Sequence, residues 1–129
     1  YFNMNQKSNK GQFSFSKDER ITNKKVIQKL FESGKKISLS PFIVKYFYDK
    51  KEVKNKVLIS VSKSKINSSV KRNLLKRRIR ESYRLNKNII NRMGYSFAIV
   101  YSSSKILKYD ELNKNLIDLL NKINQDEER

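Results

Sequence analysis

The stretch of this sequence best equipped for chemistry is SVKRNLLKRRIRESYRLNK, residues 69–87, with eight cationic side chains and one acid, Glu81. Like charges at helical spacing repel one another by about 0.2–0.5 kcal/mol per pair, so an external polyanion is the expected source of stabilisation. Six of the eight arginines in the chain lie between Arg72 and Arg92. Because a guanidinium fork can bind two phosphate oxygens at once, the segment predicts contacts with nucleic-acid phosphates.

The composition excludes several kinds of active site. The 129-residue chain has no cysteine and no histidine, which excludes thiolate catalysis, Cys-ligated zinc and a histidine general base. Its acidic residues are scattered in the sequence rather than clustered as Mg²⁺ sites require, so we assign no catalytic residue and no metal ligand. The net charge of +18 favours a nucleic acid as partner over an anionic membrane.

The domain organisation is simple. No apolar run approaches the ~18 residues of a membrane span, and no signal-peptide core is visible, so we expect a cytoplasmic protein with no membrane partner. Residues 17–124 are expected to form a single domain. We interpret residues 1–16 as a disordered basic tail and residues 125–129 as a frayed C-terminal tail.

Residues 70–87 are predicted to form a helix with one packed side and one cationic side. At about 100° per residue, the side that can lie on a sheet consists of Leu75, Ile79, Ser82, Tyr83 and Asn86. A cationic stripe runs beside it and consists of Arg72, Lys76, Arg80, Arg84 and Lys87, flanked by Asn73 and Arg77. Lys71 and Arg78 are expected to face solvent. An ordinary exposed helix alternates its charges, whereas residues 63–92 carry eleven cations and one acid. Its apolar side is also too narrow for a membrane-surface helix.

Two further helices are predicted on either side of this segment. The first has Thr22 or Asn23 as its N-cap, an apolar stripe that includes Leu30, and Gly34 at its end. The last begins near Tyr109, and its apolar positions recur at helical spacing: Leu112, Leu116, Leu119, Leu120 and Ile123. We expect the last helix to pack on the core.

Three strands are predicted, over Phe42–Tyr48, Val57–Ser62 and Tyr95–Tyr101, and a shorter piece near Ile37–Leu39 can pair with them. Their alternation divides the residues into two unlike faces. The expected core face is bulky: Phe42, Val44, Tyr46, Tyr48, Val57, Ile59, Val61, Tyr95, Phe97, Ile99 and Tyr101. The other face is small and partly polar: Ile43, Lys45, Phe47, Leu58, Ser60, Ser62, Ser96, Ala98 and Val100. This second face is expected to be half open, with the first helix leaning over it to form a groove.

These motifs together resemble the protein subunit of bacterial ribonuclease P. In that family a helix of the type V-x-R-N-R-x-K-R-x-x-R-E follows a strand ending in S-V-S-K, here Ser60 to Lys63. The matching helix positions are Val70, Arg72, Asn73, Lys76, Arg77, Arg80 and Glu81. The stretches ERITNKKVIQKLFESGKK (19–36) and LKYDEL (107–112) resemble the family's first helix and the start of its last one. The resemblance covers residues 15–124.

The resemblance implies an α+β fold, an α/β sandwich with one mixed, mostly antiparallel sheet of about four strands and three helices. The implied order is α-β-β-β-α-β-α, as in the second domain of ribosomal protein S5. The arginine helix would then join two parallel strands through a left-handed crossover, against the usual hand of such connections.

The resemblance also implies a function. The chain would join a large catalytic RNA, bind the single-stranded 5′ leader of precursor tRNA, and promote endonucleolytic removal of that leader. The hydrolysis, with Mg²⁺, would belong to the RNA, so the protein alone would need no cofactor. One protein monomer per RNA is implied, with no DNA partner.

The implied site residues fall into three sets. The catalytic RNA would be met by Arg72, Asn73, Lys76, Arg77, Arg80 and Arg84. The leader groove would be lined by Ile27, Phe31, Ile43, Lys45 and Phe47. Further phosphate contacts would come from Arg20 and Lys63. Phe31 can either stack on a base or pack under its helix, and Phe47 is the candidate for a second stacking contact.

Two features depart from the family pattern. Leu74 stands where the third residue of the family's R-N-R triplet is an arginine, and Arg78, one turn further on, is a possible partial substitute. The stretch between Lys63 and Arg72 is one residue longer than usual, so residue matches across Ser64–Ser69 are loose.

Three alternatives have different functions. A basic ribosomal or RNA-chaperone protein would share the composition and the sheet-plus-helix architecture, but the ordered motifs favour ribonuclease P. In a DNA-binding helix-turn-helix another helix would precede the basic helix, whereas here a strand precedes it. A protein-only nuclease would need a carboxylate cluster.

Overall fold

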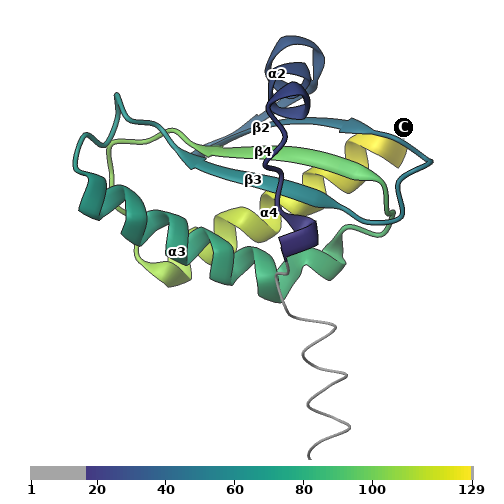
Figure 1. Cartoon of the computed structure of the whole chain (residues 1–129). Helices are drawn as coiled ribbons and strands as arrows, with labels where there is room; N and C mark the ends of the chain where they lie inside the picture. Colours follow the sequence, from purple (N-terminus) through teal and green to yellow (C-terminus); the bar gives the residue numbers. More distant parts are fainter. Residues whose placement is uncertain (1–16, 129) are drawn as a thin grey trace, which may run out of the picture.

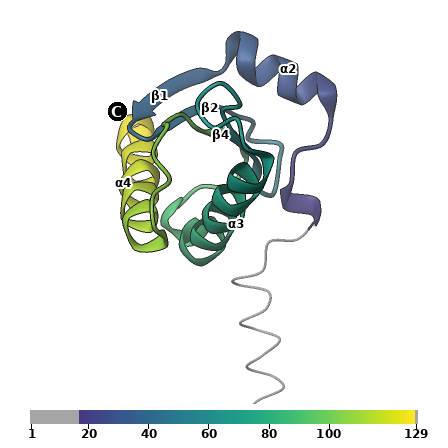
Figure 2. The same ribbon diagram turned by 90° about the vertical axis from the view of Figure 1, so that its left-hand side faces the viewer.

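The computed structural model describes residues 17–128, and the expected N-terminal tail, residues 1–16, lies outside this range. The described chain forms a sheet with α3 (Ser69–Asn86) and α4 (Tyr109–Glu128) on one face and α2 (Lys24–Ser33) on the other, as Figures 1 and 2 show from two directions. Short 3₁₀ turns, η1 (Lys17–Glu19) and η2 (Lys87–Ile89), lie before α2 and after α3.

The sheet has four strands in the spatial order β1-β2-β4-β3. These are β1 (Lys35–Leu39), β2 (Phe42–Tyr48), β3 (Lys56–Val61) and β4 (Tyr95–Tyr101). β1 pairs antiparallel with β2, and β2 pairs antiparallel with β4. β3 and β4 are parallel neighbours joined through α3. The predicted fold class and element order are therefore confirmed, and each predicted strand is found within about two residues of its expected bounds.

The bulky face of the sheet forms the main core, as predicted from its alternation. Along β4, Tyr95, Phe97, Ile99 and Tyr101 all face this side and are at most 1% exposed. The apolar stripe predicted for the last helix lies against them, since all five of its members are fully buried: Leu112, Leu116, Leu119, Leu120 and Ile123. The packed side predicted for α3 is also confirmed, because Leu75, Ile79, Ser82 and Tyr83 are buried.

α2 crosses the small-residue face at an angle that brings its backbone close to the strands. Its N-cap is Asn23, whose side chain accepts a hydrogen bond from the Lys25 N–H at 2.8 Å. Leu30 and Ala98 are both fully buried where the helix crosses β4, and the single methyl of Ala98 permits this close approach. The helix ends at Gly34 as predicted, where a Cβ would lie 2.5 Å from the Leu30 carbonyl oxygen.

The C-terminal end of the chain differs from the prediction. Residues 125–129 were expected to fray, but α4 continues to Glu128. The Glu127 carboxylate accepts hydrogen bonds from the Tyr46 hydroxyl at 2.8 Å and from the Lys35 ammonium at 3.0 Å. Burial raises the pKa of Glu127, but these two hydrogen bonds outweigh burial and hold that pKa below its usual range. The last turn of α4 is thus fastened to the sheet.

Candidate RNA interface

α3 carries the candidate interface on the side next to its packed face. Tyr83 lies beneath it, and burial, with a contribution from the nearby Glu19 charge, raises the pKa of this phenol so that it stays neutral. At about 100° per residue the cationic side chains follow one continuous side of the helix, as predicted. We call the set Arg72, Asn73, Lys76, Arg77, Arg80 and Arg84 the arginine stripe.

Three cations of the stripe are unpaired. Within residues 17–128, no acidic side chain and no hydrogen-bond acceptor engages Lys76, Arg77 or Arg80. Arg77 and Arg80 are exposed and Lys76 is half-buried. These side chains therefore present their full donor capacity to an external anion.

Two other members of the stripe are held by the protein itself. One guanidinium nitrogen of Arg72 donates to the Ile66 carbonyl oxygen at 2.8 Å, which positions the group and leaves its other N–H donors for a ligand. Arg84 pairs with Glu81, its neighbour on the next turn, at 2.5 Å. This pair is about half exposed, so an incoming phosphate can compete for the arginine.

The expectation for Lys87 was wrong. It was placed at the end of the cationic side, but its ammonium pairs with Glu19 at 2.7 Å. Both side chains are largely buried, with 13% and 16% of their surface exposed. The pair joins η1 to the end of α3, so Lys87 holds η1 against this helix.

The expectation for Arg78 was also wrong. A guanidinium nitrogen of Arg78 donates to the Leu107 carbonyl oxygen, just before α4 begins. Leu74 lies about 40° from Arg78 around the helix and is half-buried on the same flank. Neither residue shares the side of Lys76 and Arg80, and Arg78, which shares the flank of Leu74, is held by the Leu107 carbonyl.

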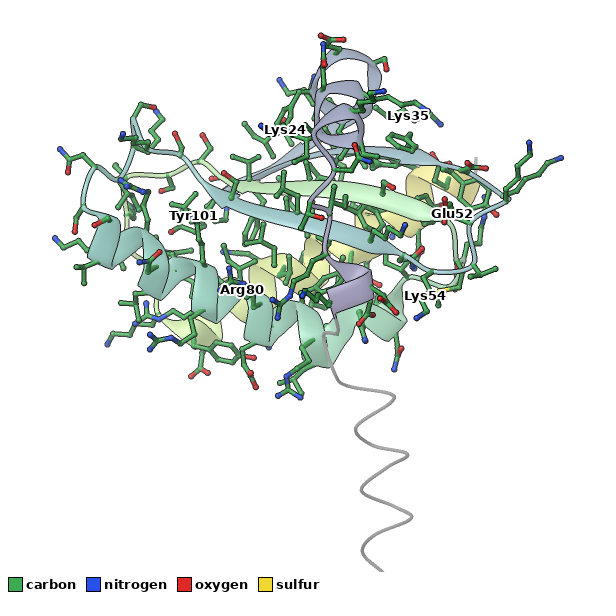
Figure 3. The ribbon with its side chains drawn as sticks, viewed as in Figure 1. Lys24, Lys35, Glu52, Lys54, Arg80 and Tyr101 are labelled. Carbon is green, nitrogen blue, oxygen red and sulfur yellow. The ribbon has the colours of Figure 1, made fainter. Side chains whose placement is uncertain are left out.

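A small cleft connects the stripe with the segment before α2. The cleft, of about 170 Å³, is lined by Arg20, by Arg80 and by the β3 residues Val57, Leu58 and Ile59. The segment is held there because the Ile21 N–H donates to the Val57 carbonyl oxygen at 3.1 Å. Figure 3 labels Arg80 on α3, on the side of this segment. Arg20 was predicted as a separate phosphate contact, and the structure brings it to the stripe.

Lys63, the other separate phosphate candidate, is exposed in the turn that follows β3. The adjoining Ser62 N–H donates to the Tyr101 carbonyl oxygen at 2.9 Å, which anchors the start of this turn to the sheet. Lys63 therefore projects from a fixed point at the carboxyl end of β3, before the start of α3.

Four of the predicted groove residues lie together. Ile27 and Phe31 share one flank of α2, and Phe31 is 43% exposed, so its ring is not part of the core. Lys45 lies below this flank, and its ammonium donates to the Phe31 carbonyl oxygen at 3.0 Å. Ile43 is half-buried one step further along β2, in register with Val100. We call Ile27, Phe31, Ile43 and Lys45 the aromatic flank.

Phe47, the fifth predicted groove residue, does not belong to the aromatic flank. It lies beyond the line along which α2 crosses the sheet, and the Lys29 ammonium covers its ring at 4.3 Å from the centroid. A second stacking contact beside Phe31 is therefore not available from Phe47. Sequence alternation correctly assigned Phe47 to this sheet face. On that face, however, α2 lies between Phe47 and the other four predicted groove residues.

The described residues form no group of three or more acidic side chains that could hold a metal ion. The described helices also include none that is both long enough and apolar enough to span a membrane. Sequence reasoning missed one feature of this surface, a cavity of about 500 Å³ beside Phe47. No sequence pattern marks it, because its walls come from α2, β2, β3 and β4.

These features define an RNA-binding α+β protein built around a basic helix, and the comparisons with known proteins agree. The family model described as Ribonuclease P matches residues 15–124. A ribonuclease P protein component from Porphyromonas gingivalis is 33% identical over 102 residues, covering 78% of this chain and 74% of the relative. One from Clostridium botulinum is 36% identical over 107 residues, covering 82% and 95%. The chain therefore belongs to the ribonuclease P protein family.

Solved structures show the same fold. The Staphylococcus aureus RNase P protein superposes with a TM-score of 0.69 at 24% identity, covering 81% of this chain and 94% of that one. The Thermotoga maritima RNase P protein gives a TM-score of 0.68 at 22% identity, covering 81% and 96%. Family membership decides for the ribonuclease P subunit over the ribosomal alternative. RNA binding and tRNA processing follow from the family.

Proposed function

We propose that this chain acts as the accessory subunit of ribonuclease P, with two separate RNA surfaces and no catalytic group of its own. The arginine stripe would hold the catalytic RNA, and the aromatic flank would hold the 5′ leader of precursor tRNA. The observation that carries the proposal is the set of three unpaired cations, Lys76, Arg77 and Arg80, on one side of a single rigid helix.

The stripe suits a folded RNA because its donors are fixed relative to one another. Successive cations on one side of α3 are separated by roughly one helical turn, about 5.4 Å. Guanidinium groups at this spacing can contact neighbouring phosphates of an RNA backbone, which fixes position without reading sequence. Arg72 adds a guanidinium whose orientation is already set by the Ile66 carbonyl.

The aromatic flank suits a single strand. The exposed ring of Phe31 offers one stacking surface, worth about 1–3 kcal/mol per base, and Ile43 offers an apolar contact beside it. The resemblance to the family implies an aromatic residue at the position of Ile27, which has no ring, and Phe47 lies on the other side of α2. We therefore propose that this chain binds the leader more weakly, and with less selectivity among bases, than the family pattern implies.

The chemical step is assigned to the RNA. Hydrolysis of the phosphodiester would use Mg²⁺ bound by the RNA, and the protein would contribute by screening phosphate repulsion where leader and catalytic RNA approach each other. We propose one protein per RNA, acting in the cytoplasm, where precursor tRNA is processed.

Reconstitution tests the proposal directly. The purified full chain is mixed with a bacterial ribonuclease P RNA, and leader release from precursor tRNA is followed at limiting Mg²⁺. We expect the chain to accelerate release, and to do so less when Lys76, Arg77 and Arg80 are all replaced by alanine. A chain that leaves the rate unchanged across a range of salt concentrations would contradict the proposed role.

A further inference from the structure

The cavity of about 500 Å³ lies on the flank of α2 opposite to the aromatic flank. Val26 and Lys29 of the helix form one wall, and Phe47 of β2 and Ser96 of β4 lie on the sheet side. Because positions 26 and 29 fall on the other side of Leu30 from Ile27 and Phe31, the helix separates the cavity from the proposed leader surface. The volume is within the range of sites that hold small organic ligands.

Ser96 is the most informative residue of the cavity. Only 6% of it is exposed, although it is a polar residue in the middle of a sheet face. Its hydroxyl forms no hydrogen bond with another residue in the described range, and because no buried side-chain oxygen or nitrogen in that range lacks a partner, this hydroxyl is open to the cavity that Ser96 lines. A ligand in the cavity can therefore reach it as a hydrogen-bond donor or acceptor.

The charges around the cavity are arranged unevenly. Arg20, Lys25 and Lys29 are exposed around the first turns of α2, where the positive end of the helix dipole adds to their charge. Asp49 and Glu52, from the connection between β2 and β3, also line the cavity, and Glu52 is 3.8 Å from the Lys56 ammonium. The cavity therefore offers cations that suit a phosphate and carboxylates that suit a group that donates hydrogen bonds.

We propose that this cavity binds one nucleotide of a single-stranded RNA. Its phosphate lies against Arg20, Lys25 and Lys29, and its base contacts Phe47 and the Ser96 hydroxyl. The carboxylates accept hydrogen bonds from ribose hydroxyls or exocyclic amines, and they would disfavour a bare anion. The inference rests on the proposed RNA-binding function and adds a site beyond the stripe and the aromatic flank.

Arg20 supports this assignment because it borders both the cavity and the cleft that contains Arg80. A strand that leaves the arginine stripe at Arg80 can thus reach the cavity along a continuous cationic edge. The RNA would pass the outer edge of β3, where the segment before α2 is fixed by its hydrogen bond to Val57.

Nuclear magnetic resonance of the full chain, titrated with a single-stranded heptauridine RNA, tests the inference. We expect saturable shifts of the amide signals of Thr22, Val26 and Ser96, and inorganic phosphate at the same concentration should not reproduce them. Ser96→Val removes the hydroxyl and partly fills the cavity, and should weaken binding at these signals about tenfold while the α3 signals still respond. Ser38→Val, the same change at an exposed position of β1, should leave the affinity unchanged.

A second variant keeps the test decisive if Ser96→Val does not fold. Lys29 is exposed, so Lys29→Gln should fold normally and weaken binding at the cavity signals several-fold. Shifts confined to α3 and the aromatic flank would overturn the inference and leave the proposed function standing. Identical cavity shifts with phosphate alone would show a simple anion site and would also overturn it. No response anywhere, α3 included, would contradict the proposed function as well.

Discussion

The two faces of the sheet are formed by alternate residues of the same strands, yet they have different roles. The face toward α3 and α4 is lined mostly by buried aromatic and branched side chains, which form the main core. The face toward α2 has small and polar residues, and a single ten-residue helix covers only a band across it. The comparison teaches that one face supplies stability, and the incomplete cover of the other leaves room for RNA on both sides of α2.

The largest expected effect is on the free energy of unfolding, and it comes from a substitution in the sheet face that packs on α3 and α4. Phe97 is fully buried between the sheet and α4, so Phe97→Ala should lower the free energy of unfolding by about 3–5 kcal/mol. Urea denaturation followed by circular dichroism measures it. A loss below about 1 kcal/mol would show that this face is not the main source of stability.

A smaller effect is expected from a substitution on the side of the sheet that α2 covers. This substitution should change RNA binding rather than stability. Phe31→Ala should cost about 1–3 kcal/mol in affinity for precursor tRNA, because it removes the exposed stacking ring. Fluorescence anisotropy of labelled precursor tRNA with the assembled chain and ribonuclease P RNA measures this. Mature tRNA without a leader is the control and should show no change. An equal loss with mature tRNA would place Phe31 outside the leader site.

The smallest effect concerns the contact that fastens the end of α4 to the sheet. Because the pKa of Glu127 is lowered in the folded protein, its ionised form stabilises the fold above the unfolded pKa, near 4.5, and this stabilisation is lost as the pH falls through the folded value. Glu127→Gln should therefore cost about 1 kcal/mol at pH 7. The difference from the unmodified chain should shrink below pH 4.5.

Thermal unfolding at several pH values measures this difference. Asp118→Asn, the same loss of a carboxylate at an exposed position in the middle of α4, is the comparison. A difference that stays constant from pH 7 to pH 3 would contradict the assigned role of Glu127.

Much of this arrangement could be predicted from the sequence, because it depends on local periodicity. The alternation along β2 and β4 separated the two faces correctly, and helical spacing placed Lys76 and Arg80 on one side of α3. Both patterns follow from backbone geometry and need no knowledge of tertiary contacts.

The errors all concern partners that are distant in the sequence. Lys87 was expected at the end of the exposed cationic stripe, but it pairs with Glu19, 68 residues away. Arg78 was expected to face solvent, but it donates to the Leu107 carbonyl before α4. The end of α4 was expected to fray, but Glu127 reaches Tyr46. Phe47 was grouped with Phe31 because the angle at which α2 crosses the sheet is not encoded in either segment alone.

The salt dependence of binding between the full chain and ribonuclease P RNA tests the central claim most directly. Replacing Lys76, Arg77 and Arg80 together by alanine should flatten the slope of log K against log salt concentration by about three, roughly one for each lost phosphate contact. Lys114→Ala is the control: this lysine is exposed on α4, outside the arginine stripe, and its loss should leave the slope nearly unchanged. An unchanged slope in the triple variant would contradict the assignment of this helix side to RNA.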